Sequence, residues 1–412
     1  MRARRRRGEI RLLRVSAAAN RRFTVVRRVY GATSDHVAAS WSPRNDLLLE
    51  RKAEFQVKMN GGECRTVLVT GGAGFIGSHL IGALAVRFPL WRIINVDNLR
   101  YCSSLKNLTS VENRRTYSFI PGDVCDPFFI KRVFATERID VVFHCAAETH
   151  VENSFLSPAR FMRVNAEGTG VLIRAAFEAR VKRFVFISTD EVYGDALEQP
   201  FDELSPKRPT NPYSASKAAA ENIVMSYWMK HKFPVLITRS SNVYGPHQHH
   251  EKVIPRFLSL IQQDQKCTIQ GSGLQSRHFL YVSDVTDAFL MLMEEGILGE
   301  IYNIGSSFEI PIIQLARELV KMKVKGVSEE ALDDWMEFVE DRPVTELRYP
   351  MRSDKLHRLG WRPRVTWEEG IRRTIQWYEE NPNYWPLNSE NEEDSPAACD
   401  QTPCLITSDN DY

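Results

Sequence analysis

The sequence predicts an α/β protein: a doubly wound parallel sheet followed by a smaller C-terminal α/β domain. Three observations predict this class. Short apolar runs of β type alternate with helical patterns over the first half of the folded region. A spaced set of glycines follows the first run, and polar or acidic residues follow several others. Such sheets bind ligands at the carboxyl ends of their strands, so these residues are candidates for a single cleft.

The first predicted strand covers residues 66–70 and leads directly into Gly71, Gly74 and Gly77. An apolar helix follows, from residue 78 to about residue 86. This spacing permits a tight turn, lets backbone amides approach a diphosphate, and lets the helix pack closely on its strand. Spaced glycines alone often mark only a flexible loop, but the strand before them and the helix after them favour a dinucleotide site.

The second predicted strand, residues 92–96, ends in Asp97, which lies 20 residues after Gly77. A carboxylate in this place hydrogen-bonds the ribose hydroxyls of adenosine and repels a phosphate there. We therefore expect NAD as the cofactor, although Arg100 lies near enough to keep NADP open.

Later strands and helices continue the alternation. The predicted strands are 117–121, 141–145, 184–188 and 235–238, and the predicted helices are 128–134, 165–179 and 213–230. The residues that this pattern places at carboxyl ends of strands are Asp123, Ala146, Ala147, Thr149 and Thr189. One cleft can therefore hold the whole set.

Two carboxylates, Asp190 and Glu191, directly follow the buried strand 184–188. A charge beside a buried strand loses hydration, which costs free energy unless the carboxylate is hydrogen-bonded or serves in binding or catalysis. Tyr213 and Lys217 lie four residues apart and share a helix face, where the ammonium favours the phenolate and brings the phenol into working range. Taken singly, each feature is more often structural, as a helix cap or a chance spacing. Together, beside a nucleotide-binding signature, they indicate an active site.

The two ends of the chain carry charge of opposite sign. Residues 1–62 hold 15 Lys or Arg and 5 Asp or Glu, which is +10 and leaves −8 for the remainder of a chain of net charge +2. We expect this extension to be disordered and inert, with a transit peptide as the second interpretation and a nucleic-acid-binding arm as the third; Met59 could itself be a start. Residues 388–412 hold seven acidic and no basic residues, and we expect disorder there too.

The composition excludes several classes of protein. The 412 residues are 43% hydrophobic, which suffices for a sizeable core. No apolar run reaches the roughly 18 residues of a membrane span, and no interleaving of basic and aromatic residues indicates nucleic acid as the ligand. Seven scattered cysteines without a Cys-x-x-Cys pair suit a reducing compartment, so we expect a cytoplasmic protein, or a mitochondrial one if the extension is a transit peptide.

Six motifs carry a resemblance to a known family. They are Gly71-x-x-Gly74-x-x-Gly77, Asp123-Val124, Ala146-Ala147-Glu148-Thr149-His150-Val151, Thr189-Asp190-Glu191-Val192-Tyr193-Gly194, Tyr213-x-x-x-Lys217 and Asn242-Val243-Tyr244-Gly245-Pro246. Over about residues 65–380 the chain resembles the extended short-chain dehydrogenases, and within them the dTDP-glucose 4,6-dehydratase family of nucleotide-sugar dehydratases. The pair Asp190-Glu191 discriminates: related epimerases lack it, and related decarboxylases keep only the Glu.

The resemblance implies a Rossmann-type NAD-binding domain over residues 63–245, to which a segment near 279–306 returns. Residues 246–387 would form mainly the substrate-binding domain. A homodimer that forms through helices is also implied.

The resemblance also implies a reaction. Tyr213, helped by Lys217 and Thr189, would take the proton from the glucose C4 hydroxyl while hydride passes to NAD. Glu191 would then remove the C5 proton as Asp190 protonates the departing C6 hydroxyl, and the hydride would return to C6. The substrate would be dTDP-glucose or UDP-glucose, and the net result the loss of water.

The remaining expected contacts follow from the same motifs. Expected cofactor contacts are Gly71, Gly74, Phe75, Ile76, Gly77, Asp97, Asn98, Asp123, Val124, Ala146, Ala147, Tyr213 and Lys217. Expected substrate contacts are Thr149, Thr189, Asn242, Lys252, Arg277, Asn303 and Arg342, with the cations at the diphosphate. No metal is expected, because His247, His249 and His250 lack a nearby cysteine or carboxylate cluster.

Several positions depart from the pattern of the family's bacterial members. Bacterial members carry Asp-Arg in place of Glu152-Asn153, Asp in place of His278, His in place of Thr345 and Thr in place of Val164. These changes leave the expected catalytic residues intact and keep UDP-glucose open as the substrate. Two other functions also stay open: a sugar-nucleotide 4-epimerase, which has no use for the acidic pair, and a non-catalytic NAD-binding sensor.

Overall fold

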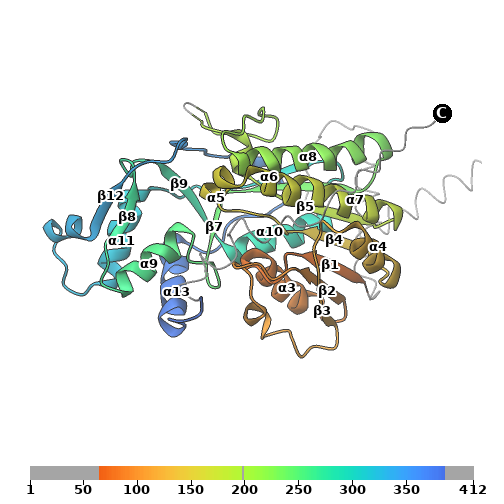
Figure 1. Ribbon diagram of the computed structural model, residues 1–412, viewed down its shortest axis with the longest axis horizontal. Coiled ribbons are helices and arrows are strands. Elements are labelled where there is room, and N and C mark those ends of the chain that lie inside the picture. The colour runs from red at the N-terminus through yellow and green to blue at the C-terminus, as the bar shows by residue number, and fades with distance from the viewer. Residues whose placement is uncertain (1–64, 197–198, 386–412) are drawn as a thin grey trace, which may run out of the picture. The chain divides into compact units, whose positions relative to one another are not determined.

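The computed structural model describes residues 65–196 and 199–385 (Figure 1). The predicted basic extension and acidic tail lie outside these residues. Among the described residues, no helix combines the length and the apolar character that crossing a membrane requires.

A seven-stranded sheet forms the centre of the N-terminal part of the described residues, in the order β10-β6-β5-β4-β1-β2-β3. Its strands are β1 (Thr66–Thr70), β2 (Arg92–Asp97), β3 (Tyr117–Pro121), β4 (Val141–His144), β5 (Arg183–Thr189), β6 (Val235–Ser240) and β10 (Ile301–Ile304). Every neighbouring pair is parallel. The strand order reverses between β1 and β4, so the carboxyl ends of these two strands open a crevice there. The predicted doubly wound sheet is confirmed.

Helices cover both faces of this sheet (Figure 1). On one face lie α4 (Pro127–Thr136), α5 (Val151–Leu156), α6 (Pro158–Phe161), the π-helical turn η2 (Met162–Glu167), α7 (Gly168–Glu178) and α8 (Pro212–His231). On the other, α3 (Phe75–Arg87) packs against α10 (Val282–Glu295). The predicted helix over 165–179 thus begins as a π-helical turn. β10 pairs with β6 and belongs to the segment expected to return to this domain.

The C-terminal part is smaller and mixed. Its strands are β7 (Asn242–Tyr244), β8 (Cys267–Gln270), β9 (Ser276–Tyr281), β11 (Glu309–Pro311) and β12 (Met336–Val339). Its helices are α9 (Val253–Gln262), α11 (Ile312–Lys323), α12 (Asp354–Arg358) and α13 (Trp367–Glu380). Short 3-10 turns occur in both parts: η1 (Leu105–Leu108) and η3 (Asp190–Tyr193) precede this part of the chain, and η4 (Glu330–Trp335) lies within it. β9 joins the two parts, because it pairs with β7 and leads directly into α10.

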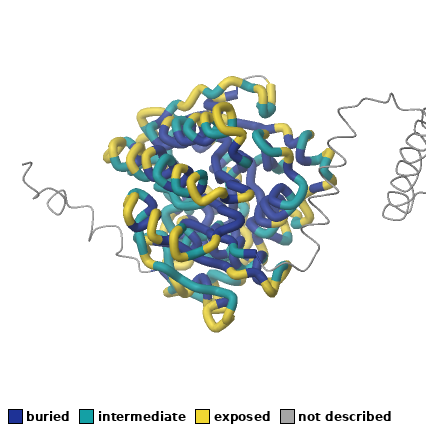
Figure 2. The backbone as a smooth tube through the Cα atoms, turned by 90° about the vertical axis from the view of Figure 1, so that its right-hand side faces the viewer, coloured by how far each residue is buried: buried dark blue, intermediate teal, exposed yellow. Residues whose placement is uncertain are grey.

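Two separate apolar cores hold these parts together. The first lies between the large sheet and its helices and includes Leu68, Phe184 and Val224. The second includes Phe257 of α9 and Leu319 of α11. Figure 2 shows the buried backbone running through the interior. Burial of each such side chain contributes about 1.5–3 kcal/mol, so both cores give the strand ends a firm support.

Candidate active site

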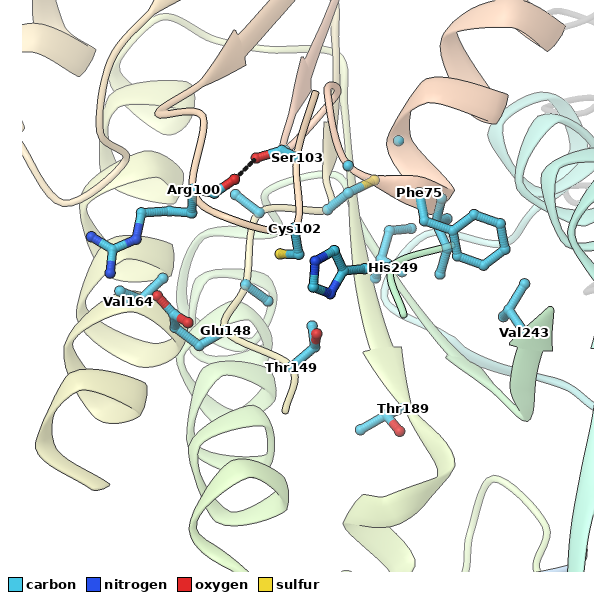
Figure 3. Close-up of a pocket in the computed structure, with 18 of the residues that line it drawn as sticks. Phe75, Arg100, Cys102, Ser103, Glu148, Thr149, Val164, Thr189, Val243 and His249 are labelled. Carbon is cyan, nitrogen blue, oxygen red and sulfur yellow. Dashed lines mark hydrogen bonds between the residues drawn. The ribbon is translucent and has the colours of Figure 1, made fainter. Parts of the chain in front are cut away.

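A cleft of about 300 Å³ opens at the carboxyl ends of the central strands. Most of the predicted site residues line it. They are Gly71, Gly74, Phe75, Ile76, Gly77, Asp97, Asn98, Asp123, Val124, Ala146, Ala147, Thr149, Thr189, Asp190, Glu191, Tyr213, Lys217, Asn242 and Lys252. Figure 3 shows Cys102, Thr149 and His249 reaching this space from three different loops. The fold therefore brings together residues from β1, β2, β4, β5 and α8.

A second cleft of about 220 Å³ continues from the first. Thr149, Glu191 and Lys252 line both, so the two form one passage. Arg277 and Arg342 line the second cleft, which belongs mainly to the C-terminal part. The passage thus has the glycine turn at one end, and its other end is lined by both basic and acidic side chains.

The glycine turn leaves no room for side chains. Gly71 has φ +69°, and a Cβ there would lie 2.6 Å from the backbone nitrogen of Ala146. A Cβ on Gly77 would lie 2.2 Å from the carbonyl oxygen of Gly71. Gly74 is the N-cap of α3 and has no side-chain cap of its own. The amides at the start of α3 therefore face the cleft, where a diphosphate would be favoured.

Asp97 ends β2 and is held by the loops around it. Its carboxylate accepts hydrogen bonds from the backbone nitrogens of Ala73 at 2.9 Å and Leu99 at 2.8 Å, and from the Ser103 hydroxyl at 3.1 Å. Burial raises the pKa of Asp97, and these hydrogen bonds oppose the shift. Asn98 lies exposed beside it at the rim.

The two adjacent carboxyl groups stand in different surroundings at the end of β5. The Thr189 hydroxyl donates to Asp190 Oδ1 at 3.2 Å and accepts from the Glu191 backbone nitrogen at 3.3 Å. Asp190 is 2% exposed, and its burial together with the charge of Glu191 raises its pKa well above the usual value. Desolvation, and next the charge of Glu346, also raise the pKa of Glu191, while Arg277 opposes this. The pair is therefore suited to hold one proton between two carboxyl groups.

A capping box starts α8 and fixes its first turn. The side chain of Asn211 accepts from the Ser214 backbone nitrogen at 2.8 Å, the Ser214 hydroxyl faces back to the Asn211 backbone nitrogen, and Pro212 occupies the first turn. Tyr213 and Lys217 follow on this rigid start, and both are buried.

The pKa of Tyr213 shifts in the direction opposite to the prediction. Burial raises the pKa of Tyr213, the charge of Glu191 adds to this, and a hydrogen bond with Thr189 opposes it. Burial lowers the pKa of Lys217 to about 8. The net shift of the Tyr213 pKa is therefore upward, where the sequence predicts a downward shift. The Lys217 ammonium donates to the Ile187 carbonyl oxygen at 2.6 Å. The charges of Glu191 and Asp190 raise the pKa of the Tyr213 phenol.

The predicted cationic contacts lie along the second cleft. Arg277 donates to the carbonyl oxygen of Glu346 at 3.1 Å. Arg342 pairs with Glu152 at 2.7 Å. Lys252 donates to the carbonyl oxygen of Thr149 at 2.8 Å. Each of these three side chains is therefore held by a neighbouring group beside the second cleft.

Asn303 is not part of the site. It is 0% exposed in β10 and lines neither cleft. Its Oδ1 accepts from the Tyr193 hydroxyl at 2.7 Å, and its Nδ2 donates to the Arg352 carbonyl oxygen at 3.2 Å. These bonds use the amide inside the fold, so the predicted contact with the sugar nucleotide is withdrawn.

Sequence reasoning missed several residues of the passage. Glu346 and Tyr349 line the second cleft near Glu191, and Asn211 lies behind them and donates to Glu191 and Glu346. The Tyr101 hydroxyl donates at 2.6 Å to Glu251, which lines both clefts. No spacing signal marks them, because they come from loops far apart in the chain. No group of three or more metal-binding side chains suited to an ion occurs in the part of the chain that the structure describes.

The doubly wound sheet, the glycine turn and the buried Tyr, Lys and paired carboxyls define a nucleotide-sugar dehydratase of the short-chain dehydrogenase type. The chain belongs to the GDP-mannose 4,6-dehydratase family, whose model matches residues 68–374. The resemblance to this class that the motifs predicted is confirmed.

Individual relatives agree with this assignment. The human dTDP-D-glucose 4,6-dehydratase is 57% identical over 79% of this chain and 93% of its own length. A trifunctional Arabidopsis protein with UDP-glucose 4,6-dehydratase in its name is 40% identical over 78% of this chain and 48% of its own length. A dTDP-glucose 4,6-dehydratase of Streptomyces venezuelae, solved with NAD and thymidine diphosphate, superposes with a TM-score of 0.74 at 35% identity, over 78% of this chain and 99% of that one.

Proposed function

We propose that this protein is an NAD-dependent dTDP-glucose 4,6-dehydratase, which removes water from dTDP-glucose and forms the 4-keto-6-deoxy sugar. One observation carries the proposal: Asp190 and Glu191 line the same cleft as Tyr213 and Lys217. Epimerisation at C4 requires the phenol and the ammonium, but it does not require the two additional carboxyl groups. Burying them without a use would be costly.

The cleft fits a dinucleotide. Gly71 and Gly77 leave a cradle that any Cβ would fill, the start of α3 offers backbone amides, and Asp97 stands where the adenosine ribose hydroxyls would be bound. When bound, NAD supplies the hydride acceptor and, in its oxidised form, a positive charge.

In the first half-reaction, Tyr213 takes the proton of the C4 hydroxyl. A hydrogen bond with Thr189 orients the phenol. Lys217 adds positive charge to the same buried helix turn and is fixed by the Ile187 carbonyl.

In the second half-reaction, Glu191 removes the C5 proton and Asp190 gives a proton to the departing C6 hydroxyl. The assignment follows from the surroundings: the pKa of Asp190 is raised well above its usual value, so its carboxyl is the one that keeps the proton. Arg277 limits the corresponding rise for Glu191, which leaves it available as the base.

We place dTDP-glucose before UDP-glucose as the substrate. Three mammalian relatives named for the dTDP sugar share 55–57% identity with the chain, whereas the plant protein named for the UDP sugar shares 40% and more distant relatives named for the dTDP sugar share 38–39%. Arg277, Arg342 and Lys252 would bind the diphosphate of either, because they recognise phosphate oxygens and not the base.

The test is incubation with dTDP-glucose and, separately, UDP-glucose that carries deuterium at C4. We expect a product that has lost one water and carries the deuterium at C6, with faster turnover of the dTDP sugar. An unchanged mass with inverted C4 would establish an epimerase. Binding of NAD with both sugars left intact would favour a sensor.

We also propose a homodimer that forms through helices. Leu156 at the end of α5 is 81% exposed, and Met162 at the start of η2 is 41% exposed. Both helices adjoin α8, and apolar side chains there suit a surface that a second copy covers. Light scattering of the full chain should give twice the monomer mass; a monomer mass would overturn this.

A further inference from the structure

We propose that Glu346 is a positioning residue for Glu191, which it orients and makes more basic through the shared amide of Asn211. This inference rests on the proposed function, because it takes Glu191 as the base that removes the C5 proton. It adds a third carboxylate to the site, supplied by the C-terminal part of the chain.

Asn211 has its orientation fixed by the start of α8. Its Oδ1 accepts from the backbone nitrogen of Ser214 at 2.8 Å, as the cap of the helix. Its Nδ2 must therefore face away from the helix. There it donates to Glu191 Oε2 at 3.4 Å and to Glu346 Oε1 at 3.3 Å. One amide thus links the two carboxylates, and its direction is set by the helix that carries Tyr213.

Glu346 is itself held firmly. It is 6% exposed, and its carboxylate also accepts a hydrogen bond from the Thr210 hydroxyl. Its backbone carbonyl oxygen accepts from Arg277 at 3.1 Å. Glu346 and Glu191 both line the second cleft.

The charges around Glu191 show what Glu346 contributes. Arg277 and Lys252 face Glu191 and favour its ionised form, while Glu346 is the largest charge that opposes them. Asp190, Tyr213 and Tyr349 are the other titratable groups facing it. Without Glu346, the two cations would leave Glu191 a weaker base. A purely structural role would not need the charge, because a glutamine side chain can accept the same two hydrogen bonds.

The experiment compares Glu346→Gln with wild type and with the control Glu340→Gln, which removes one charge from an exposed position of the same segment. Single turnovers of dTDP-glucose in ²H₂O at a series of pH values give two rates: appearance of NADH absorbance and incorporation of deuterium at C5. In Glu346→Gln we expect the plateau rate of C5 exchange to fall about three- to tenfold, because a base of lower pKa is slower.

The acidic limb of that exchange should move to lower pH, since loss of the negative charge lowers the pKa of Glu191. NADH appearance should keep its wild-type rate in both variants. Glu346→Asp, which keeps the charge, should hold the acidic limb near its wild-type position. An unmoved limb in Glu346→Gln, or an equal loss of both rates, overturns the inference.

Glu191→Gln separates this inference from the proposed function. If Glu191→Gln exchanges C5 like wild type, the assignment of Glu191 as the base fails, and the role of Glu346 fails with it; the proposed function fails only if wild type forms no product that has lost one water. If Glu191→Gln abolishes exchange while Glu346→Gln matches wild type at every pH, only the role of Glu346 fails.

Discussion

Two buried sites along α8 use carboxylates in opposite ways. Near the start of the helix, at the end of β5, Asp190 is buried beside Glu191, and burial raises its pKa. Further along α8, Glu221 is 0% exposed and forms two hydrogen bonds with Arg239, at 2.9 and 2.6 Å. Burial would raise the pKa of Glu221 too, but the hydrogen bonds and charge of Arg239 outweigh it and lower the pKa.

The difference teaches that pairing, and not burial, decides what a buried carboxyl group does. Glu221 has a bidentate cation and is locked in its ionised form. Arg277 acts on Asp190 and Glu191 as a nearby charge, and Lys252 also acts on Glu191, so the protons of this pair can move. The Glu221–Arg239 pair fixes α8 to β6, whereas the carboxyl groups at the end of β5 are those proposed to react.

The largest expected effect comes from a substitution at the end of β5, where the two carboxyl groups are proposed to react. Asp190→Asn should lower the rate of C6 elimination by about 10²- to 10⁴-fold, the usual contribution of a general acid. Stability should change little, because a neutral amide replaces a carboxyl group that burial keeps neutral. Rapid-quench mass analysis should find the 4-keto intermediate with its C6 hydroxyl still in place. Wild-type turnover would remove Asp190 from the role of acid.

Removing the charge of Glu221, the partner of Arg239, should lower the free energy of unfolding instead of the rate. Glu221→Gln leaves the Arg239 guanidinium buried with a neutral partner, and loss of one partner from such a pair costs about 3–5 kcal/mol. Urea unfolding should show it. Glu294→Gln serves as the control, because its partner Arg87 is 55% exposed and such a pair is worth less than about 1 kcal/mol. A similar small loss in both variants would mean that Arg239 recovers its hydration.

The comparison also marks how far the sequence leads. The glycine turn, the strand before Thr189 and the helix that carries Tyr213 are predictable, because each depends on neighbours within a few residues. Asn303 was misplaced because its partner Tyr193 is 110 residues away. The direction of the pKa shift of Tyr213 was missed for a related reason: it depends on burial and on which carboxylates the fold brings near the phenol. Long-range contacts of this kind leave no period in the sequence.

The smallest expected effect concerns the pH dependence of stability, in which the two sites have opposite signs. The pKa of Glu221 is lowered in the folded state, so its stabilisation is present above its unfolded value of about 4.3 and is lost as the pH falls below that value. The pKa of Asp190 is raised, so its contribution is present below its unfolded value of about 3.9 and is lost as the pH rises. Between about pH 4 and 8, the free energy of unfolding of wild type relative to Asp190→Asn should therefore fall as the pH rises toward the folded-state pKa of Asp190. Urea titrations at several pH values measure it. A rise across this range would show that Asp190 is stabilised in its ionised form and is paired like Glu221.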